Sequence, residues 1–123
     1  MKLKIVLPIL GFEDIKEARL EKIDDYFYEL DCNGITFTLI DPSNIREYDF
    51  SISKTQQEAL KIKDEKDVRV FNIVTIQNPI ENSTINFLAP VIVNEKEGLL
   101  AQIALDENRY KEYGLKEPIK KFL

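Results

Sequence analysis

The first forty residues alternate between apolar and polar positions in a way that predicts four strands. Residues 3–7 place Leu, Ile and Leu at every second position, as expected for a strand with one buried face. A mixed pattern predicts a second strand over residues 18–24. The runs 27–32 and 35–40 flank Asn33-Gly34, a dipeptide that readily adopts the positive φ angles of a two-residue hairpin turn. We therefore predict a β-hairpin at this point.

The middle of the chain predicts a break, a short extended segment and one helix. Asp41-Pro42 ends the fourth strand, because proline has no N–H to donate to a sheet. Residues 45–52 place apolar side chains at every second position, which indicates a short strand or an extended edge segment. Ser53 and Gln56 have the spacing of a capping box, and residues 56–62 suit a helix lying on the surface of a core.

The second half predicts three further strands and an irregular tail. Residues 67–76 carry apolar side chains on both parities, which is typical of a central strand with both faces covered. Residues 85–93 and 99–105 follow as two more strands. The tail, about 107–123, is polar with scattered aromatic residues, so we expect an irregular segment or a short helix. These elements predict a single domain over residues 1–123, mainly β, with antiparallel strands in a small barrel-like or sandwich fold and one short surface helix.

The net charge lies in the N-terminal third of the chain. The sequence has 22 acidic and 17 basic side chains, which gives a formal net charge of −5. Residues 13–31 hold eight acids and three bases, so this segment alone carries the whole net charge. An acidic surface fits a basic protein partner and opposes non-specific binding to nucleic-acid phosphates, which requires clustered Lys and Arg. We therefore expect no direct contact with nucleic acid.

The composition also excludes several kinds of active site. Without histidine, the chain cannot build a Ser-His-Asp or Cys-His catalytic arrangement or a histidine metal site. Its single cysteine, Cys32, cannot form an intrachain disulfide, and we interpret it as a buried small residue or an inert thiol. We recognise no export signal and no membrane-spanning apolar stretch, which favours the cytoplasm and no contact with a membrane.

Two charged features leave alternatives open. The adjacent acids Glu13-Asp14 and Asp24-Asp25 either form a solvated acidic surface or belong to a small carboxylate-based hydrolase or a metal-binding β-protein. The three lysines near the C-terminus either solubilise the tail or contact RNA, as in an RNA-binding barrel; they are Lys116, Lys120 and Lys121.

Pro90 lies inside the strongly apolar stretch 86–94 and also has two interpretations. Proline within a strand is found at a bulge, at an edge or at a strand start, so the first interpretation is a buried strand with a kink. In the second, Pro90 keeps one strand edge open, so that a partner segment can pair with it by strand addition.

Four motifs together resemble the family of flagellar assembly factors called FliW. Residues 8–14, with Gly11 and Phe12, resemble the early P-G-F-E region of that family. Residues 37–42 are similar to its F-x-L-x-D-P strand ending, with Asp41 and Pro42 at the end, and Tyr48-Asp49-Phe50 is similar to its Y-E-F segment. Residues 86–94 resemble its N-L-L-A-P signature, with Leu88 and Pro90 at the matching positions. The order and spacing of the motifs fit the family over roughly residues 5–110.

The resemblance implies a small barrel-like β fold and a regulatory role without enzymatic activity or a cofactor. FliW-like proteins bind CsrA, a small basic translational regulator, and prevent it from repressing flagellin translation. They also bind flagellin, so that free flagellin would withdraw the FliW-like protein and restore repression. The chain departs from many members in two respects: few residues precede Gly11, which predicts a shorter or differently closed barrel edge, and Arg46-Glu47 stands where relatives often have a proline.

We expect the acidic N-terminal third to face a basic surface of CsrA. Because neighbouring residues of a strand point to opposite faces, only part of the acids can share one partner. Phe87, Leu88 and Pro90 belong either to the core or to a groove for flagellin, and Asn86 and Asn94 either tie adjacent loops or mark the edge of a docking site. The candidate partner-binding residues are Glu13, Asp14, Glu17, Glu21, Asp24, Asp25, Asp49, Asn86, Phe87 and Asn94, and the motif residues with an expected structural role are Gly11, Phe12, Asp41, Pro42, Tyr48, Phe50, Leu88 and Pro90.

Overall fold

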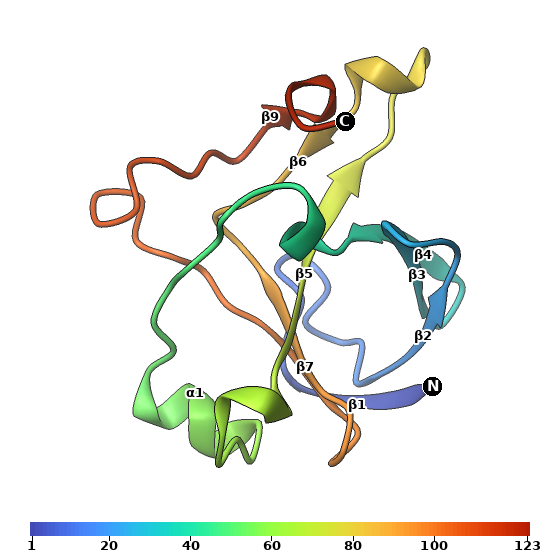
Figure 1. Ribbon diagram of the computed structural model, residues 1–123. Coiled ribbons are helices and arrows are strands. Elements are labelled where there is room, and N and C mark those ends of the chain that lie inside the picture. Colours follow the sequence, from blue (N-terminus) through green and yellow to red (C-terminus); the bar gives the residue numbers. More distant parts are fainter.

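The first four strands form an antiparallel meander in the computed structural model, which describes all 123 residues (Figure 1). They are β1 (Lys2–Leu7), β2 (Glu17–Lys22), β3 (Phe27–Cys32) and β4 (Ile35–Ile40). At the turn between β3 and β4, Asn33 and Gly34 have φ angles of 54° and 92°. Positive φ at both central residues matches the hairpin turn that the dipeptide predicts, and the predicted hairpin is confirmed.

Three later strands close this meander into a seven-stranded barrel. They are β5 (Arg69–Thr75), β7 (Val91–Asn94) and β8 (Leu99–Gln102), and the order around the barrel is β4-β3-β2-β1-β8-β7-β5. β5 returns to pair with β4, which completes the circle. The predicted barrel is confirmed, but the expectation of wholly antiparallel pairing is wrong, because β1 and β8 run parallel. Apolar alternation shows which face of a strand is buried and not the direction of its neighbour.

The few residues before Gly11 do not leave a barrel edge open. β1 pairs with β2 on one side and with β8 on the other, so the barrel closes at its first strand. Gly11 itself has a φ of +87°, in the region that glycine adopts most readily, and it turns the chain between β1 and β2.

The predicted strand over residues 85–93 is two separate strands. β6 (Thr84–Ile85) pairs with the end of β5, and β7 pairs with its beginning. Between them the side-chain oxygen of Asn86 accepts the backbone N–H of Leu88 at 3.0 Å and of Ala89 at 3.1 Å, which holds a tight turn. Pro90 stands at the end of this turn, directly before β7. Its carbonyl accepts the N–H of Ile103 at 3.0 Å and β7 has neighbours on both sides, so no edge is left open at Pro90.

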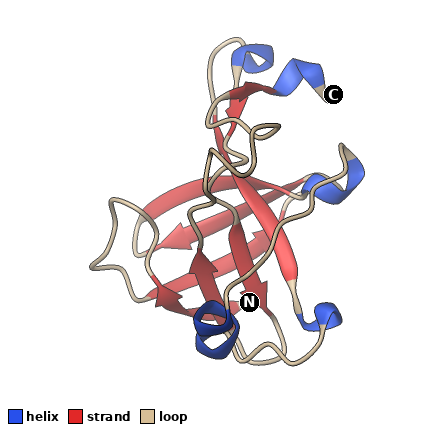
Figure 2. Cartoon of the chain, turned by 90° about the vertical axis from the view of Figure 1, so that its left-hand side faces the viewer, coloured by secondary structure: helices blue, strands red, loops and turns tan.

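β6 continues into a small projection beyond the barrel. It pairs with β9 (Glu117–Pro118), and the two short 3-10 helices η3 (Ile80–Asn82) and η4 (Ile119–Lys121) lie beside this pair. Figures 1 and 2 show the projection standing above the barrel with the C-terminus at its side. The tail is therefore mostly irregular, as expected, with one two-residue strand.

The segment between β4 and β5 contains no strand. It holds the 3-10 helix η1 (Pro42–Asn44), the helix α1 (Lys54–Ala59) and the 3-10 helix η2 (Glu65–Asp67). The predicted capping box is present: Ser53 and Gln56 exchange bonds of 2.9 and 3.1 Å, although the helix is shorter than expected and lies two residues earlier. Residues 45–52 join no sheet: they begin with a turn at Ile45 and a bend at Arg46, and beyond these the backbone N–H groups of Asp49 and Ser51 donate to tyrosine hydroxyls of the tail and not to a neighbouring strand.

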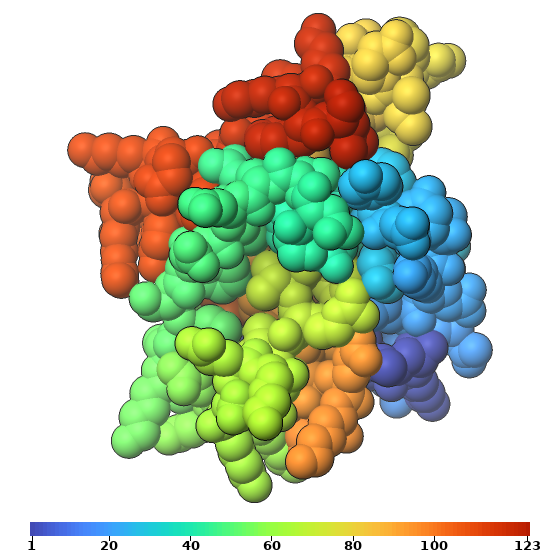
Figure 3. Space-filling model, in the orientation of Figure 1, coloured from blue at the N-terminus to red at the C-terminus, as the bar shows by residue number.

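The core has three parts, one inside the barrel and two outside. The interior is filled by apolar side chains from all seven barrel strands, with Phe71, Leu30 and Leu100 fully buried. Outside, the tail and residues 45–48 cover β5 and β6, with Phe87 at the centre. Helix α1 and its flanking residues cover β7 and β8. Figure 3 shows the tail (red) packed against the segment after β4 (green), with the first strands (blue) at one side. The outer surface of β1 to β4 therefore remains largely uncovered.

Candidate functional site

The uncovered outer face of β1 to β4 carries four of the eight acids of residues 13–31, and two of these, Glu17 and Glu21, are predicted contact residues. In β2, Ala18 and Leu20 point into the barrel, so Glu17, Arg19 and Glu21 point outward and are exposed. The same alternation in β3 buries Leu30 and turns its acidic neighbours outward. We define the outward face of β2 and β3 as the acidic face; its residues are Glu17, Arg19, Glu21, Glu29 and Asp31.

Strand register places two of these acids directly opposite each other. Glu21 of β2 is paired with Glu29 of β3, and neither carboxylate has a basic nitrogen within 4.0 Å. Like charges directly opposite in an antiparallel pair are destabilising, so this arrangement does not serve the stability of the barrel. A cationic group from outside would relieve the repulsion.

An apolar row borders this acid pair at one end of the strands. Ile23 follows Glu21 by two residues, and its N–H donates to the carbonyl of Phe27 at 2.9 Å. Ile23 is 57% exposed and Tyr26, at the turn beside it, is 41% exposed. The face thus combines charge with exposed apolar surface, which is the composition of many protein interfaces.

The bases of this face neutralise it only in part. Lys2 and Glu17 form an ion pair of 3.8 Å, and Lys22 and Asp25 form another of 3.8 Å. Both pairs are highly exposed, so each contributes little to stability and leaves its charges accessible. Arg19 stands opposite Asp31 in the register, without an ion pair within 4.0 Å.

The other predicted acids lie in loops at the rim of the same face. Asp24 accepts the N–H groups of Phe27 at 2.8 Å and Tyr26 at 2.9 Å, and these bonds lower the pKa of its carboxyl below the ordinary value. Glu13 accepts the N–H of Gly11 at 3.2 Å in the loop before β2. Asp14 lines a hollow of about 610 Å³ that also contains Lys16 and Arg19. All three acids are exposed.

The adjacent acid pairs are the residues for which the sequence left a metal-binding or hydrolytic role open. No three Asp, Glu or Cys side chains are placed to hold a metal ion. Glu13-Asp14 and Asp24-Asp25 lie on exposed loops and not in a closed cavity. Cys32 is fully buried, and burial, together with nearby Asp31, raises the pKa of its thiol to about 11. A protonated, inaccessible thiol is a poor nucleophile.

The structure places two of the candidate contact residues, Phe87 and Asn94, in the interior, and a third, the half-buried Asn86, in a turn. Phe87 is fully buried in the outer core beneath the tail, so its side chain offers no surface to a partner. Asn94 is 1% exposed and donates to the carbonyls of Leu60 at 2.8 Å and Lys61 at 3.3 Å, which ties β7 to the end of α1. Asn86 holds the turn before β7. The apolar signature therefore contributes to the core and its loops.

The motif residues Asp41, Pro42, Tyr48 and Phe50 also have structural contacts. Asp41 caps η1 by accepting the N–H of Ser43 at 3.0 Å, and Pro42 is buried at its first position. The Tyr48 hydroxyl donates to the carbonyl of Phe87 and accepts from Asn72 at 3.1 Å; burial raises its pKa far above the ordinary value. Phe50 packs against the outer core of β7 and β8.

Asp49 and Phe12, two further residues of the motifs, differ in exposure. The side chain of Asp49 is exposed and forms no hydrogen bond or ion pair, whereas its backbone N–H and carbonyl both bond to the hydroxyl of Tyr113, at 2.9 and 3.0 Å. Phe12 is half-buried and packs edge-to-face on Phe37 with ring centroids 5.1 Å apart.

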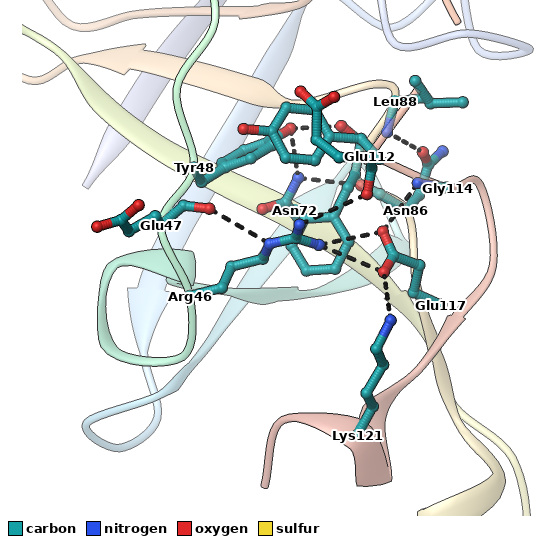
Figure 4. A network of polar contacts seen from close by, with 12 residues as sticks. Arg46, Glu47, Tyr48, Asn72, Asn86, Leu88, Glu112, Gly114, Glu117 and Lys121 are labelled. Atoms are coloured by element: carbon teal, nitrogen blue, oxygen red, sulfur yellow. Dashed lines mark hydrogen bonds and ion pairs between the residues drawn. The ribbon is translucent and has the colours of Figure 1, made fainter. Parts of the chain in front are cut away.

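Sequence reasoning missed the network around Arg46. Figure 4 shows its guanidinium beside the carboxylate of Glu117. Arg46 bonds to both carboxylate oxygens of Glu117 at 3.2 and 3.3 Å, and it lies 4.6 Å from the ring centroid of Phe87 and 4.9 Å from that of Tyr113. The two charged partners are 71 residues apart, and no spacing or motif links them. The only signal in the sequence was the departure from the family resemblance at Arg46-Glu47.

Comparisons with known proteins agree on one family. The sequence profile of the family described as FliW protein matches residues 2–119. The chain is 43% identical to flagellar assembly factor FliW 2 of Wolinella succinogenes over 99% of this chain and 92% of that protein. It is 41% identical to flagellar assembly factor FliW of Sulfurimonas denitrificans over 100% of this chain and 98% of that protein. A crystal structure of the flagellar assembly factor FliW superposes with a TM-score of 0.86 at 26% identity, covering 96% of this chain and 84% of the other.

Proposed function

Because the chain belongs to the FliW family of flagellar assembly factors, we propose that it acts in flagellar assembly as a non-enzymatic regulator that binds CsrA and flagellin. In this proposal, binding of the chain to CsrA relieves the repression of flagellin translation. Free flagellin competes for the chain and thereby restores repression. Both partners are met where flagellin is made, so the proposed place of action is the cytoplasm.

The acidic face is the observation that supports the CsrA half of the proposal. It is the outer surface of the barrel that neither the tail nor α1 covers, and its central pair, Glu21 and Glu29, forms no ion pair within 4.0 Å. CsrA is a small basic protein, so its approach would neutralise this pair. Opposite charges of this kind raise the association rate and fix orientation more than they add affinity.

Titration of the purified protein with CsrA and with flagellin, at low and at high salt, tests this proposal. We expect binding of both at micromolar concentration or below, and a decrease of CsrA affinity with salt. The double variant Glu21→Lys/Glu29→Lys should weaken CsrA binding at least about tenfold, since it replaces attraction with repulsion at the centre of the face.

The matched control is Glu58→Lys/Glu107→Lys, which changes the net charge equally at exposed acids of α1 and the tail. It should leave CsrA affinity nearly unchanged. If neither CsrA nor flagellin binds the wild-type protein, the regulatory proposal is wrong. If both double variants weaken CsrA binding equally, net charge and not the acidic face decides the interaction.

A further inference from the structure

The barrel has an incomplete seam between β4 and β5. These strands pair through only three residue pairs, from Thr38 opposite Val74 to Ile40 opposite Asn72. β5 then leaves the barrel to pair with β6, and Figure 1 shows its end rising away from β4 into the projection. The first half of β4, residues 35–37, therefore has β3 on one side and no strand on the other.

Hairpin geometry shows which backbone groups face this gap. In a two-residue hairpin, the residues that flank the turn bond to each other, and every second residue beyond them does the same. The bond from the N–H of Asp41 to the carbonyl of Tyr26, at 2.9 Å, fits this alternation at the far end of the hairpin. Odd-numbered residues of β4 thus bond to β3, and Thr36, Thr38 and Ile40 face β5.

Thr36 is left without a backbone partner on the open side. Thr38 and Ile40 find theirs in β5, but the residue that would pair with Thr36 is Ile76, which lies beyond the β4–β5 ladder. Neither the N–H nor the carbonyl of Thr36 or Ile76 makes a bond across this gap. Ile35 and Ile76 expose 41% and 48% of their surface on the two sides of it.

The charges beside the gap fit a basic segment. Asp31 of β3 lies directly opposite Thr36. One of its carboxylate oxygens accepts the N–H of Gly34 at 3.1 Å, and Arg19 stands opposite it on the other side, but no basic nitrogen lies within 4.0 Å of the carboxylate. If a strand of the partner pairs with β4 beside Thr36, its residue opposite Thr36 lies two strand spacings, about 10 Å, from Asp31. The side chain of a lysine or an arginine spans this distance over the small Thr36 side chain. Apolar residues of the same strand would cover Ile35 and Ile76.

We propose that the open edge of β4 at Thr36 binds an extended, basic segment of a partner protein by strand addition. The segment bonds to the N–H and the carbonyl of Thr36, covers Ile35 and Ile76, and directs a lysine or an arginine toward Asp31. The inference rests on the proposed function, because it takes CsrA, the basic partner, as the first protein to be tested. It adds a backbone-mediated contact to the charge-mediated one at Glu21 and Glu29.

The variant Thr36→Pro tests the edge directly. Proline removes the outward N–H and leaves the bonds between β3 and β4 intact, because the N–H of residue 36 takes no part in them. We expect an unchanged circular dichroism spectrum. CsrA binding should be weakened at least about tenfold, because the variant loses the hydrogen bond from the N–H of residue 36 and the proline ring obstructs the added strand. Thr36→Val keeps the N–H and the shape, and should bind as the wild type does.

Amide exchange provides a second measurement that needs no variant. In the free protein the amide of Thr36 should exchange much faster than that of Phe37, which faces β3. On addition of CsrA the exchange of Thr36 should slow. If Thr36→Pro fails to fold, this measurement still decides the question.

Three outcomes would overturn the inference. In the first, Thr36→Pro binds CsrA as tightly as Thr36→Val does; this result would not contradict the proposed function. Another is an unchanged exchange rate of Thr36 in the complex. The third is a concentration-dependent dimer of the free chain that Thr36→Pro dissociates, because the edge would then belong to a second copy. If CsrA does not bind the wild-type chain, flagellin replaces it in the same design, and failure of both overturns the proposed function as well.

Discussion

At the scale of single residues, Arg46 connects the two ends of the fold. Its side chain is 18% exposed and that of Glu117 is 12% exposed, so this ion pair is far more shielded from water than those on the acidic face. The guanidinium also stacks on Phe87, Tyr113 and Phe122. A planar cation with five donors suits this position, which a lysine would fill poorly.

Replacement of Arg46 by alanine should therefore destabilise the protein strongly. We expect a loss of about 3 kcal/mol in the free energy of unfolding, because the change removes both guanidinium bonds to the largely buried Glu117 carboxylate, which keeps only the exposed Lys121 at 3.6 Å and the N–H of Gly114 at 2.8 Å. Chemical denaturation measures the effect. The matched control is Lys2→Ala at the exposed pair with Glu17, where we expect less than about 1 kcal/mol. Equal effects at the two sites would show that the shielded network does not anchor the tail.

Asp24 makes the stability of the folded protein depend on pH in the acidic range. Its folded-state pKa is lowered by the N–H groups of Phe27 and Tyr26, so its ionised form favours the folded chain. This contribution is fully present above the unfolded-state pKa of about 4 and is lost as the pH falls through the lower folded-state value.

Asp24→Ala should therefore be less stable than the wild type at neutral pH, and the difference should shrink as the pH is lowered below about 4. Thermal unfolding at several pH values measures it. Asp25→Ala is the control, because the Asp25 carboxylate accepts no backbone bond, and its difference from the wild type should not follow this profile. A constant deficit of Asp24→Ala at every pH would contradict the assigned cause.

At the scale of elements, the sequence predicted the turns and caps that are formed by bonds between residues close together in the chain. Asn33-Gly34 and the pair Ser53/Gln56 each specify a turn or a cap through groups a few residues apart, and both are present in the structure. The break at Asn86 was missed, because its side chain ends β6 by bonding to the next backbone groups within an otherwise apolar stretch. For residues 45–52 the sequence predicted a short strand or an extended edge segment, and no strand forms there. The bonds to the backbone of this segment come from the hydroxyls of Tyr110 and Tyr113, far along the chain, which no local pattern indicates.

The capping box makes α1 a test of local stability. Ser53→Ala should lower the free energy of unfolding by about 1 kcal/mol, since it removes the acceptor for the N–H of Gln56. Ser53→Asp should restore most of the loss, because aspartate caps equally well. Urea denaturation compares the three proteins. If Ser53→Ala is as stable as the wild type, α1 is held by the packing of Leu60 and not by its cap.

At the scale of the whole molecule, coverage of the barrel separates a structural side from a free side. The sequence predicted the acidic segment and the alternation that turns only some acids outward. It did not predict that Glu21 and Glu29 stand opposite each other, because register is decided by the barrel as a whole. The tail and α1 cover the other strands through contacts such as Arg46 with Glu117 and Asn94 with Leu60, which no local pattern contains. The central claim is that the free side, the outer face of β1 to β4, receives the partner.

Backbone hydrogen–deuterium exchange of the protein, free and saturated with CsrA, tests this claim most directly. We predict slower exchange in the complex for amides of β2, β3 and the first half of β4, and unchanged exchange in α1 and in the tail from residue 107 onward. Protection confined to α1 or to the tail, with the amides around Glu21 and Glu29 unaffected, would contradict it.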